Sequence, residues 1–168
     1  RFNTTSWGAI YVRMSRSKIE NCTIVRNYAG IRSYPDRVLP VVNCVFDNRD
    51  TAYAQDISMP SGSVAGGVTL TNCYFASKDR IKDYMENTGC VFTSEPGFVD
   101  REGGDYRLVK NSPLREAGVK MEWMARATDL DGNFRLVDAF GWRNSVALPD
   151  IGCYECGIKA PGFILKVQ

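Results

Sequence analysis

Two tyrosines, two arginines and an aspartate near the amino terminus are the side chains best suited to chemistry. Tyr11 and Arg13 alternate with apolar residues in one short segment, and Arg32 and Tyr34 lie in a similar segment further on. Such alternation is typical of strands with one buried face, so these four side chains should point outward, with Asp56 following them in a third segment. Arginine binds carboxylates bidentately and aromatic rings pack on sugar rings. This face is therefore suited to bind an acidic polysaccharide.

Catalysis on the same face is a narrower expectation. A polysaccharide lyase needs a cation that stabilises an enolate and a base that removes the proton next to the carboxylate, and arginine and tyrosine have this chemistry. The chain has no histidine, which excludes Ser-His-Asp and Cys-His catalysis within it. If the protein is an enzyme, we expect a polysaccharide lyase or glycoside hydrolase whose active site this chain alone does not complete. The alternative is a solvated outer face without a ligand.

An aspartate-rich segment is the candidate metal site. Asp129, Asp131 and Asn133 alternate as oxygen ligands do at the start of a calcium loop, so calcium is the cofactor to expect there. The segment departs from helix-loop-helix calcium loops, because its glycine is fourth instead of sixth and Phe140 stands where glutamate should be twelfth. The alternative is a turn in which the aspartates accept backbone N–H bonds and Arg135 pairs with a carboxylate.

Three cysteines raise the question of redox or zinc chemistry. Cys153-x-x-Cys156 has the spacing of both kinds of motif. A thioredoxin-like motif should open a helix in a βαβ unit, and a four-cysteine zinc site needs a second close pair, neither of which the sequence shows. A disulfide from Cys90 to one of the two is one alternative, and unpaired structural cysteines are the other.

A short phrase, apolar-x-Asn-Cys-x-Ile/Phe, recurs along the first half of the chain. Its copies are Ile19–Ile24, Val41–Phe46 and Leu70–Phe75, with a degenerate fourth at Thr88–Phe92. Apolar residues at period two predict strands on both sides of the asparagine. Asparagine tolerates the left-handed backbone conformation, so it can turn the chain sharply between the two strands. A further strand precedes each pair: Gly8–Val12, Gly30–Tyr34 and Asp56–Ser58.

Three short strands and three turns in each repeat predict an all-β fold, a parallel β-helix of three to four rungs. A leucine-rich repeat has a similar period, but it needs several leucines and a helical segment in each unit. Stacked rungs should place equivalent residues in columns about 4.8 Å apart. We expect interior columns of Cys22, Cys44 and Cys73 and of Ile24, Phe46 and Phe75, and a ladder of Asn21, Asn43 and Asn72 whose amides bond from rung to rung.

The repeat pattern ends after Cys90. We expect residues 1–93 to form the rungs and residues 94–168 to form a loop-rich cap packed on the carboxy end of the coil, because proline and glycine become frequent there. Ser112-Pro113 should begin a single helical turn that Gly118 ends, and residues 119–128 should form a short helix.

This second half resembles the carboxy-terminal part of secreted bacterial right-handed parallel β-helix proteins, in the pectate-lyase-like superfamily and of the choice-of-anchor Q type. The resemblance rests on five motifs in order: Phe98–Asp100, Asp105–Leu108, Ser112–Gly118, Asp129–Arg135 and Asp150–Glu155. It implies a right-handed coil, a secreted or cell-surface location and an association with polysaccharides. It fixes no activity, because function does not follow from fold.

Charge and composition limit the partners. There are 21 Lys and Arg against 19 Asp and Glu, a net charge of +2, which lacks the basic footprint of a nucleic-acid protein. Apolar runs are too short for a membrane span. The partner to expect is polysaccharide, and the alternative function is a structural or adhesive surface module. Because the chain opens within a rung at Arg1, we also expect its open amino-terminal end to meet further rungs or a second copy.

Overall fold

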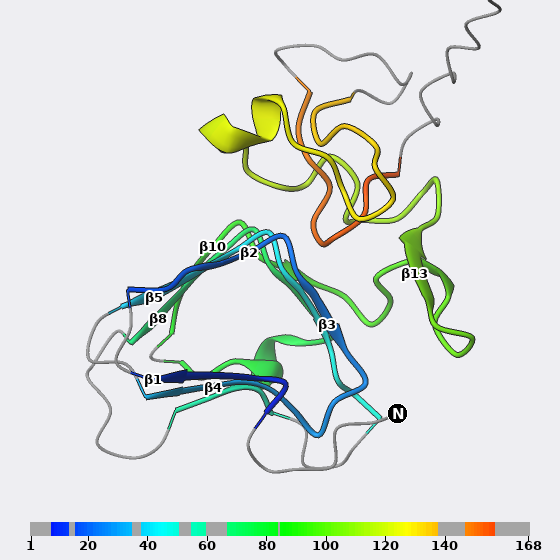
Figure 1. The fold of residues 1–168 in the computed structure, drawn as a ribbon. Helices are drawn as coiled ribbons and strands as arrows, with labels where there is room; N and C mark the ends of the chain where they lie inside the picture. Colours follow the sequence, from blue (N-terminus) through cyan, green and yellow to red (C-terminus); the bar gives the residue numbers. More distant parts are fainter. Residues whose placement is uncertain are drawn as a thin grey trace, which may run out of the picture.

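The fold is a coil of three parallel sheets with an irregular region beside it (Figure 1). The computed structural model describes residues 8–13, 16–34, 38–50, 55–59, 67–83, 85–137 and 147–156. The sheets have the strand orders β1-β4-β7, β10-β8-β5-β2 and β11-β9-β6-β3. Each sheet thus takes one strand from every rung, all parallel, as in a parallel β-helix. This confirms the fold predicted from the repeats.

The coil has three complete rungs and two strands of a fourth. The first rung contains β1 (Ile10–Arg13), β2 (Ile19–Glu20) and β3 (Thr23–Val25). The second contains β4 (Ala29–Tyr34), β5 (Leu39–Val42) and β6 (Val45–Asp47). The third contains β7 (Gln55–Ser58), β8 (Val68–Thr71) and β9 (Tyr74–Phe75), and the fourth begins with β10 (Glu86–Thr88) and β11 (Val91–Phe92).

Asparagine forms the sharp corner between the second and third strands of each complete rung. Asn21, Asn43 and Asn72 have φ angles of 49°, 51° and 47°, in the left-handed region that asparagine tolerates. Gly89 takes the same place in the fourth rung, with φ of 65°. The corner predicted from the asparagine repeat is confirmed, and glycine is its natural substitute.

Two columns of side chains fill the interior beside this corner. The rings of Phe46 and Phe75 stack with centroids 5.1 Å apart and an interplanar angle of 1°. Cys44 and Cys73 are fully buried next to them, and their thiols donate to backbone carbonyls two residues earlier, 3.2 Å away for Cys44. The cysteine is therefore a small apolar filler whose weak donor is satisfied inside the turn.

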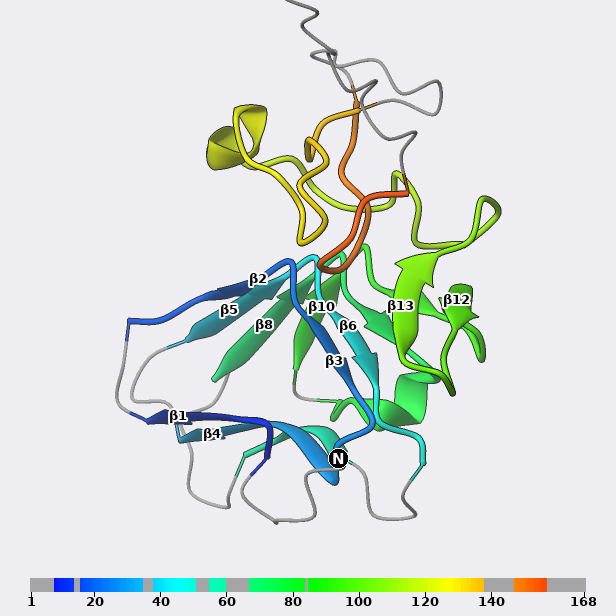
Figure 2. The same cartoon turned by 45° about the vertical axis from the view of Figure 1, so that its right-hand side comes forward.

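The second half of the chain packs along one corner of the coil (Figure 2). It contains the antiparallel pair β12 (Phe98–Asp100) and β13 (Asp105–Leu108), and the 3-10 helix η2 (Glu122–Ala125) lies where a short helix was predicted. The expectation of a cap over the carboxy end of the coil is wrong in position. The last rung is instead closed by the segment of the 3-10 helix η1 (Lys78–Arg80), from which Ile81 and Met85 are buried in the coil interior.

The asparagine ladder is the seam between the coil and the cap. The Val119 N–H donates to Asn43 Oδ1 and Asn43 Nδ2 donates to the Val119 carbonyl, both at 2.8 Å. Asn72 Nδ2 donates to the Ala117 carbonyl at 2.8 Å. The amide bonds predicted to run from rung to rung are absent among the described residues, because the amides reach the cap main chain instead.

Apolar packing completes this interface. Val45 and Tyr74 face outward from β6 and β9, yet both are fully buried against the cap residues Leu108, Leu114 and Ile151. The sheet β11-β9-β6-β3 is therefore covered on both faces at its centre. Coil and cap share one apolar interface as well as hydrogen bonds.

The first-rung strands β1, β2 and β3 each pair with a neighbour on one side only among the described residues. Residues 1–7 precede them and lie outside the described residues. The expectation of further rungs or a second copy at this end stays a prediction.

Candidate functional site

The outer face of β1 and β4 brings together four of the five residues predicted to bind sugar. The parallel register places Tyr11 opposite Arg32 and Arg13 opposite Tyr34. Val12 and Ile31, which alternate with them, are buried in the coil. We call Tyr11, Arg13, Arg32 and Tyr34 the Tyr–Arg cluster.

The cluster is ordered by contacts among its own members. The rings of Tyr11 and Tyr34 lie 5.6 Å apart at an angle of 55°. Arg32 Nη2 donates to the Tyr34 hydroxyl at 2.9 Å, and its guanidinium lies 5.6 Å from the centre of the Tyr34 ring. Tyr11 is 43% exposed and Arg13 is exposed, so the face is open to solvent. Two cations and two aromatic rings are thus presented together.

Asp56 does not join the cluster. Its side chain is fully buried, where Asn48 Nδ2 donates to Oδ1 at 2.8 Å and Arg80 Nε donates to Oδ2 at 3.0 Å. Burial nevertheless raises the pKa of the Asp56 carboxyl above its ordinary value. The sequence pattern missed this because the arginine that turns the aspartate away comes from η1, 24 residues later.

The aspartate-rich segment forms a closed turn. Asp129 Oδ1 accepts the backbone N–H groups of Asp131 and Asn133 at 2.9 and 2.7 Å, and Oδ2 accepts that of Glu155 at 2.9 Å. Asp131 forms an ion pair with Arg107 at 2.6 Å. The carboxylate oxygens therefore face N–H donors, as in the alternative of an aspartate turn.

This donor set does not fit calcium. A calcium ion needs six to eight oxygen ligands turned toward it, whereas these oxygens are engaged by N–H groups. Within the described ranges, no group of three or more Cys, Asp or Glu side chains is arranged to hold a metal ion.

The buried ion pair between Arg135 and Glu155 is the electrostatic centre of the cap. Arg135 Nη1 lies 3.0 Å from Glu155 Oε1, and the Asp150 backbone N–H donates to Oε2 at 2.9 Å. This confirms the expected pairing of Arg135 with a carboxylate. Burial, and then the charge of nearby Asp150, raises the pKa of Glu155 from 4.5 to about 8.

The unfolding free energy should therefore fall as pH rises from about 5 to about 9. In this window the folded protein retains a proton on Glu155 that the unfolded chain has released, so the contribution of Glu155 is present at low pH and is lost through its folded pKa. We expect a loss of about 1–3 kcal/mol, below the limit of 1.36 kcal/mol per pKa unit. Urea unfolding at several pH values measures it. In Glu155→Gln the slope should flatten, and an unchanged slope would exclude Glu155 as its source.

The cysteines serve structure in the described chain. All six are free. Cys90, considered as a partner for Cys153 or Cys156, instead extends the interior column beside Cys73. The disulfide alternative is therefore not supported. The register of the degenerate fourth repeat was the signal that assigned Cys90 to the column.

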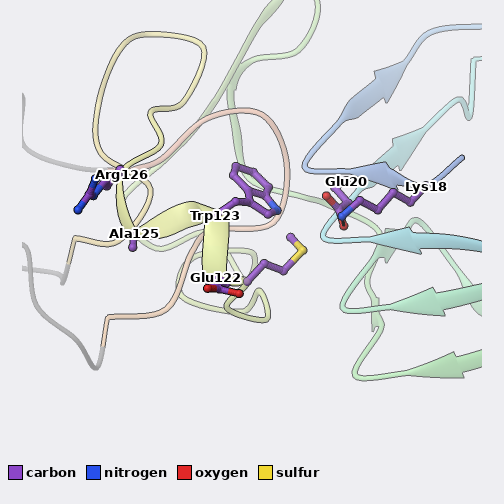
Figure 3. A pocket seen from close by; sticks show the side chains of 7 residues that line it. Lys18, Glu20, Glu122, Trp123, Ala125 and Arg126 are labelled. Atoms are coloured by element: carbon purple, nitrogen blue, oxygen red, sulfur yellow. Dashed lines mark ion pairs between the residues drawn. The ribbon is translucent and has the colours of Figure 1, made fainter.

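A groove between the coil and the cap was not predicted (Figure 3). Lys18 and Glu20, at the start of β2, form one wall, and Met121, Trp123 and neighbouring residues of η2 form the other. The groove has a volume of about 770 Å³. Sequence patterns cannot find it, because its walls are about one hundred residues apart and meet only once the cap lies along the asparagine ladder.

These observations define an all-β protein, a parallel β-helix with a cap along its side. None of the helices in the described ranges is long and apolar enough to cross a membrane. A scan against protein-family models and searches of curated proteins and solved structures gave no match. The assignment of the fold thus rests on strand order and register.

Proposed function

We propose that this chain is a carbohydrate-binding part of a secreted or cell-surface β-helix protein, of the bacterial pectate-lyase-like, choice-of-anchor Q type. Its Tyr–Arg cluster holds acidic polysaccharide on the outer face of β1 and β4. The observation that carries this proposal is the pairing of two aromatic rings with two guanidinium groups on one exposed sheet face.

Charge favours an acidic ligand at the cluster. In the described parts of β1, β4 and β7, the exposed outward positions carry no acidic side chain, because the one aspartate among them is buried with Arg80. A guanidinium held against a tyrosine ring loses little freedom when a carboxylate binds it. Uronate carboxylates and the C–H faces of sugar rings match this arrangement.

Binding without turnover fits these residues better than catalysis does. β-Elimination needs a base poised to take a proton from the sugar ring. Asp56, the nearest carboxylate in the predicted set, is fully buried and ion-paired with Arg80. We therefore propose that the cluster holds the polymer.

Replacing Arg32 by alanine should weaken binding of polygalacturonate or alginate by about 1–3 kcal/mol, the usual size for a hydrogen bond to a charged group. Arg32→Lys should recover only part of this loss, because lysine keeps the charge but lacks the planar pair of donors. Titration calorimetry at low and high salt measures both effects, and binding should fall as salt rises.

Lys110→Ala is the matched control, since Lys110 is an exposed cation of the cap, remote in sequence from the cluster. It should bind as the parent does. Equal losses in Arg32→Ala and Lys110→Ala would indicate attraction by net charge alone. An absence of binding to any acidic polysaccharide would favour the structural or adhesive module.

A further inference from the structure

The groove between β2 and η2 has the size and lining of a ligand site. Ligand pockets usually span about 300–1,000 Å³ and combine an aromatic surface with a few polar groups, and this groove measures about 770 Å³. Figure 3 shows Trp123 between η2 and the side chains of Lys18 and Glu20, which lie on the opposite wall. It is separate from the Tyr–Arg cluster, because it lies on the second sheet of the coil and not the first.

The charges that line the groove cancel. Lys18 and Glu20 form an ion pair at 2.9 Å across β2, and Glu122 and Arg126 stand on the opposite wall. Two acidic and two basic groups give no net attraction for a polyanion or a polycation. They do provide both donors and acceptors, which suits a neutral ligand rich in hydroxyl groups.

Trp123 provides the apolar surface of the groove. It is 43% exposed, although an indole ring of this size is usually more buried. Met121 lies in the same lining. A broad aromatic face flanked by charged hydrogen-bonding groups matches a pyranose ring, which has an apolar C–H face and a polar rim.

Asn21 supplies the second observation. It is only 6% exposed, and its side-chain oxygen and nitrogen have no hydrogen-bond partner among the described residues. Such buried groups are rare and call for an explanation. Along the ladder, Asn72 meets residue 117 and Asn43 meets residue 119, so the same step brings Asn21 to residue 121, which lines the groove.

The third place on the ladder is thus unfilled where the groove begins. The chain turns into η2 after Met121 and does not continue along the asparagine ladder. A hydroxyl group both donates and accepts, so adjacent sugar hydroxyls can satisfy the two polar atoms of one amide.

We propose that this groove binds a neutral oligosaccharide, with Trp123 packed on a sugar ring and Asn21 bonded to its hydroxyl groups. The site is independent of the Tyr–Arg cluster and prefers a different ligand. The protein would then contact a neutral and an acidic glycan through different faces.

Titration calorimetry of the whole chain with neutral hexasaccharides of glucose, xylose, mannose and N-acetylglucosamine tests the proposal. At least one should bind at millimolar concentration or below. Trp123→Ala should weaken that binding by about tenfold or more, as loss of an aromatic anchor usually does. Trp123→Phe should retain most of it. If no neutral hexasaccharide binds, or if Trp123→Ala binds as the parent does, the proposal is overturned.

Asn21→Gly tests the buried amide without breaking the corner, because Gly89 occupies the equivalent position with φ of 65°. It should weaken binding severalfold in a chain with unchanged circular dichroism, and unchanged affinity would remove Asn21 from the site. Leu130→Ala, at a cap residue that is 70% exposed, is the control for Trp123→Ala. Arg32→Ala should leave neutral binding intact, so failure of the acidic site and failure of this groove remain distinguishable.

Discussion

Replacing Phe75 by alanine should lower the free energy of unfolding by about 3–5 kcal/mol, the usual cost of removing a buried phenylalanine ring. Phe75 is fully buried at the centre of an aromatic column. It stacks on Phe46 at 5.1 Å and on Phe92 at 6.0 Å. The cavity would separate three consecutive rungs, and in a repeat protein each rung is stabilised mainly by its neighbours. Equilibrium unfolding in urea measures the loss.

Phe75→Leu provides the matched comparison, because it keeps apolar volume while removing the ring stack. We expect it to cost about 1–2 kcal/mol, less than alanine, since a smaller cavity remains. Leu130→Ala, at an exposed site, should change stability by less than about 0.5 kcal/mol. If Phe75→Ala unfolds at the same urea concentration as Leu130→Ala, the column is not the core.

The coil could be predicted from sequence because its information is local and repeated. Each Asn-Cys phrase carries its own corner and its own inward residues, and strand register follows from aligning one copy with the next. Even the degenerate copy is informative, since Gly89 replaces asparagine at a corner that requires positive φ. The same logic placed the four members of the Tyr–Arg cluster on one face.

The cap, the buried aspartate and the groove could not be predicted in this way. Each depends on a contact between segments that share no pattern: Asp56 with Arg80, Asn43 with Val119, and the start of β2 with η2. Tertiary position decides whether an aspartate on a strand meets solvent or a guanidinium. Alternation within the strand carries no information about that choice.

Asn43 should be the second position at which one substitution has a large effect. Its amide makes two hydrogen bonds of 2.8 Å to Val119, and its φ of 51° lies where most residues are strained. Asn43→Ala loses both bonds, worth about 0.5–1.5 kcal/mol each, and adds about 1–2 kcal/mol of left-handed strain. We expect a loss of about 2–4 kcal/mol in the free energy of unfolding.

Asn43→Gly separates the two contributions, because glycine adopts positive φ freely but makes no side-chain bond. It should cost about 1–2 kcal/mol, the part due to the lost contact with the cap. Asn72→Ala keeps the strain but removes only one cap bond, to Ala117, so it should fall between the two Asn43 variants. Protease cleavage within residues 117–121 should rise in all three variants, because the ladder holds this segment on the coil. If cleavage stays at the parent rate while stability falls, the asparagines act at the corner alone and do not anchor the cap.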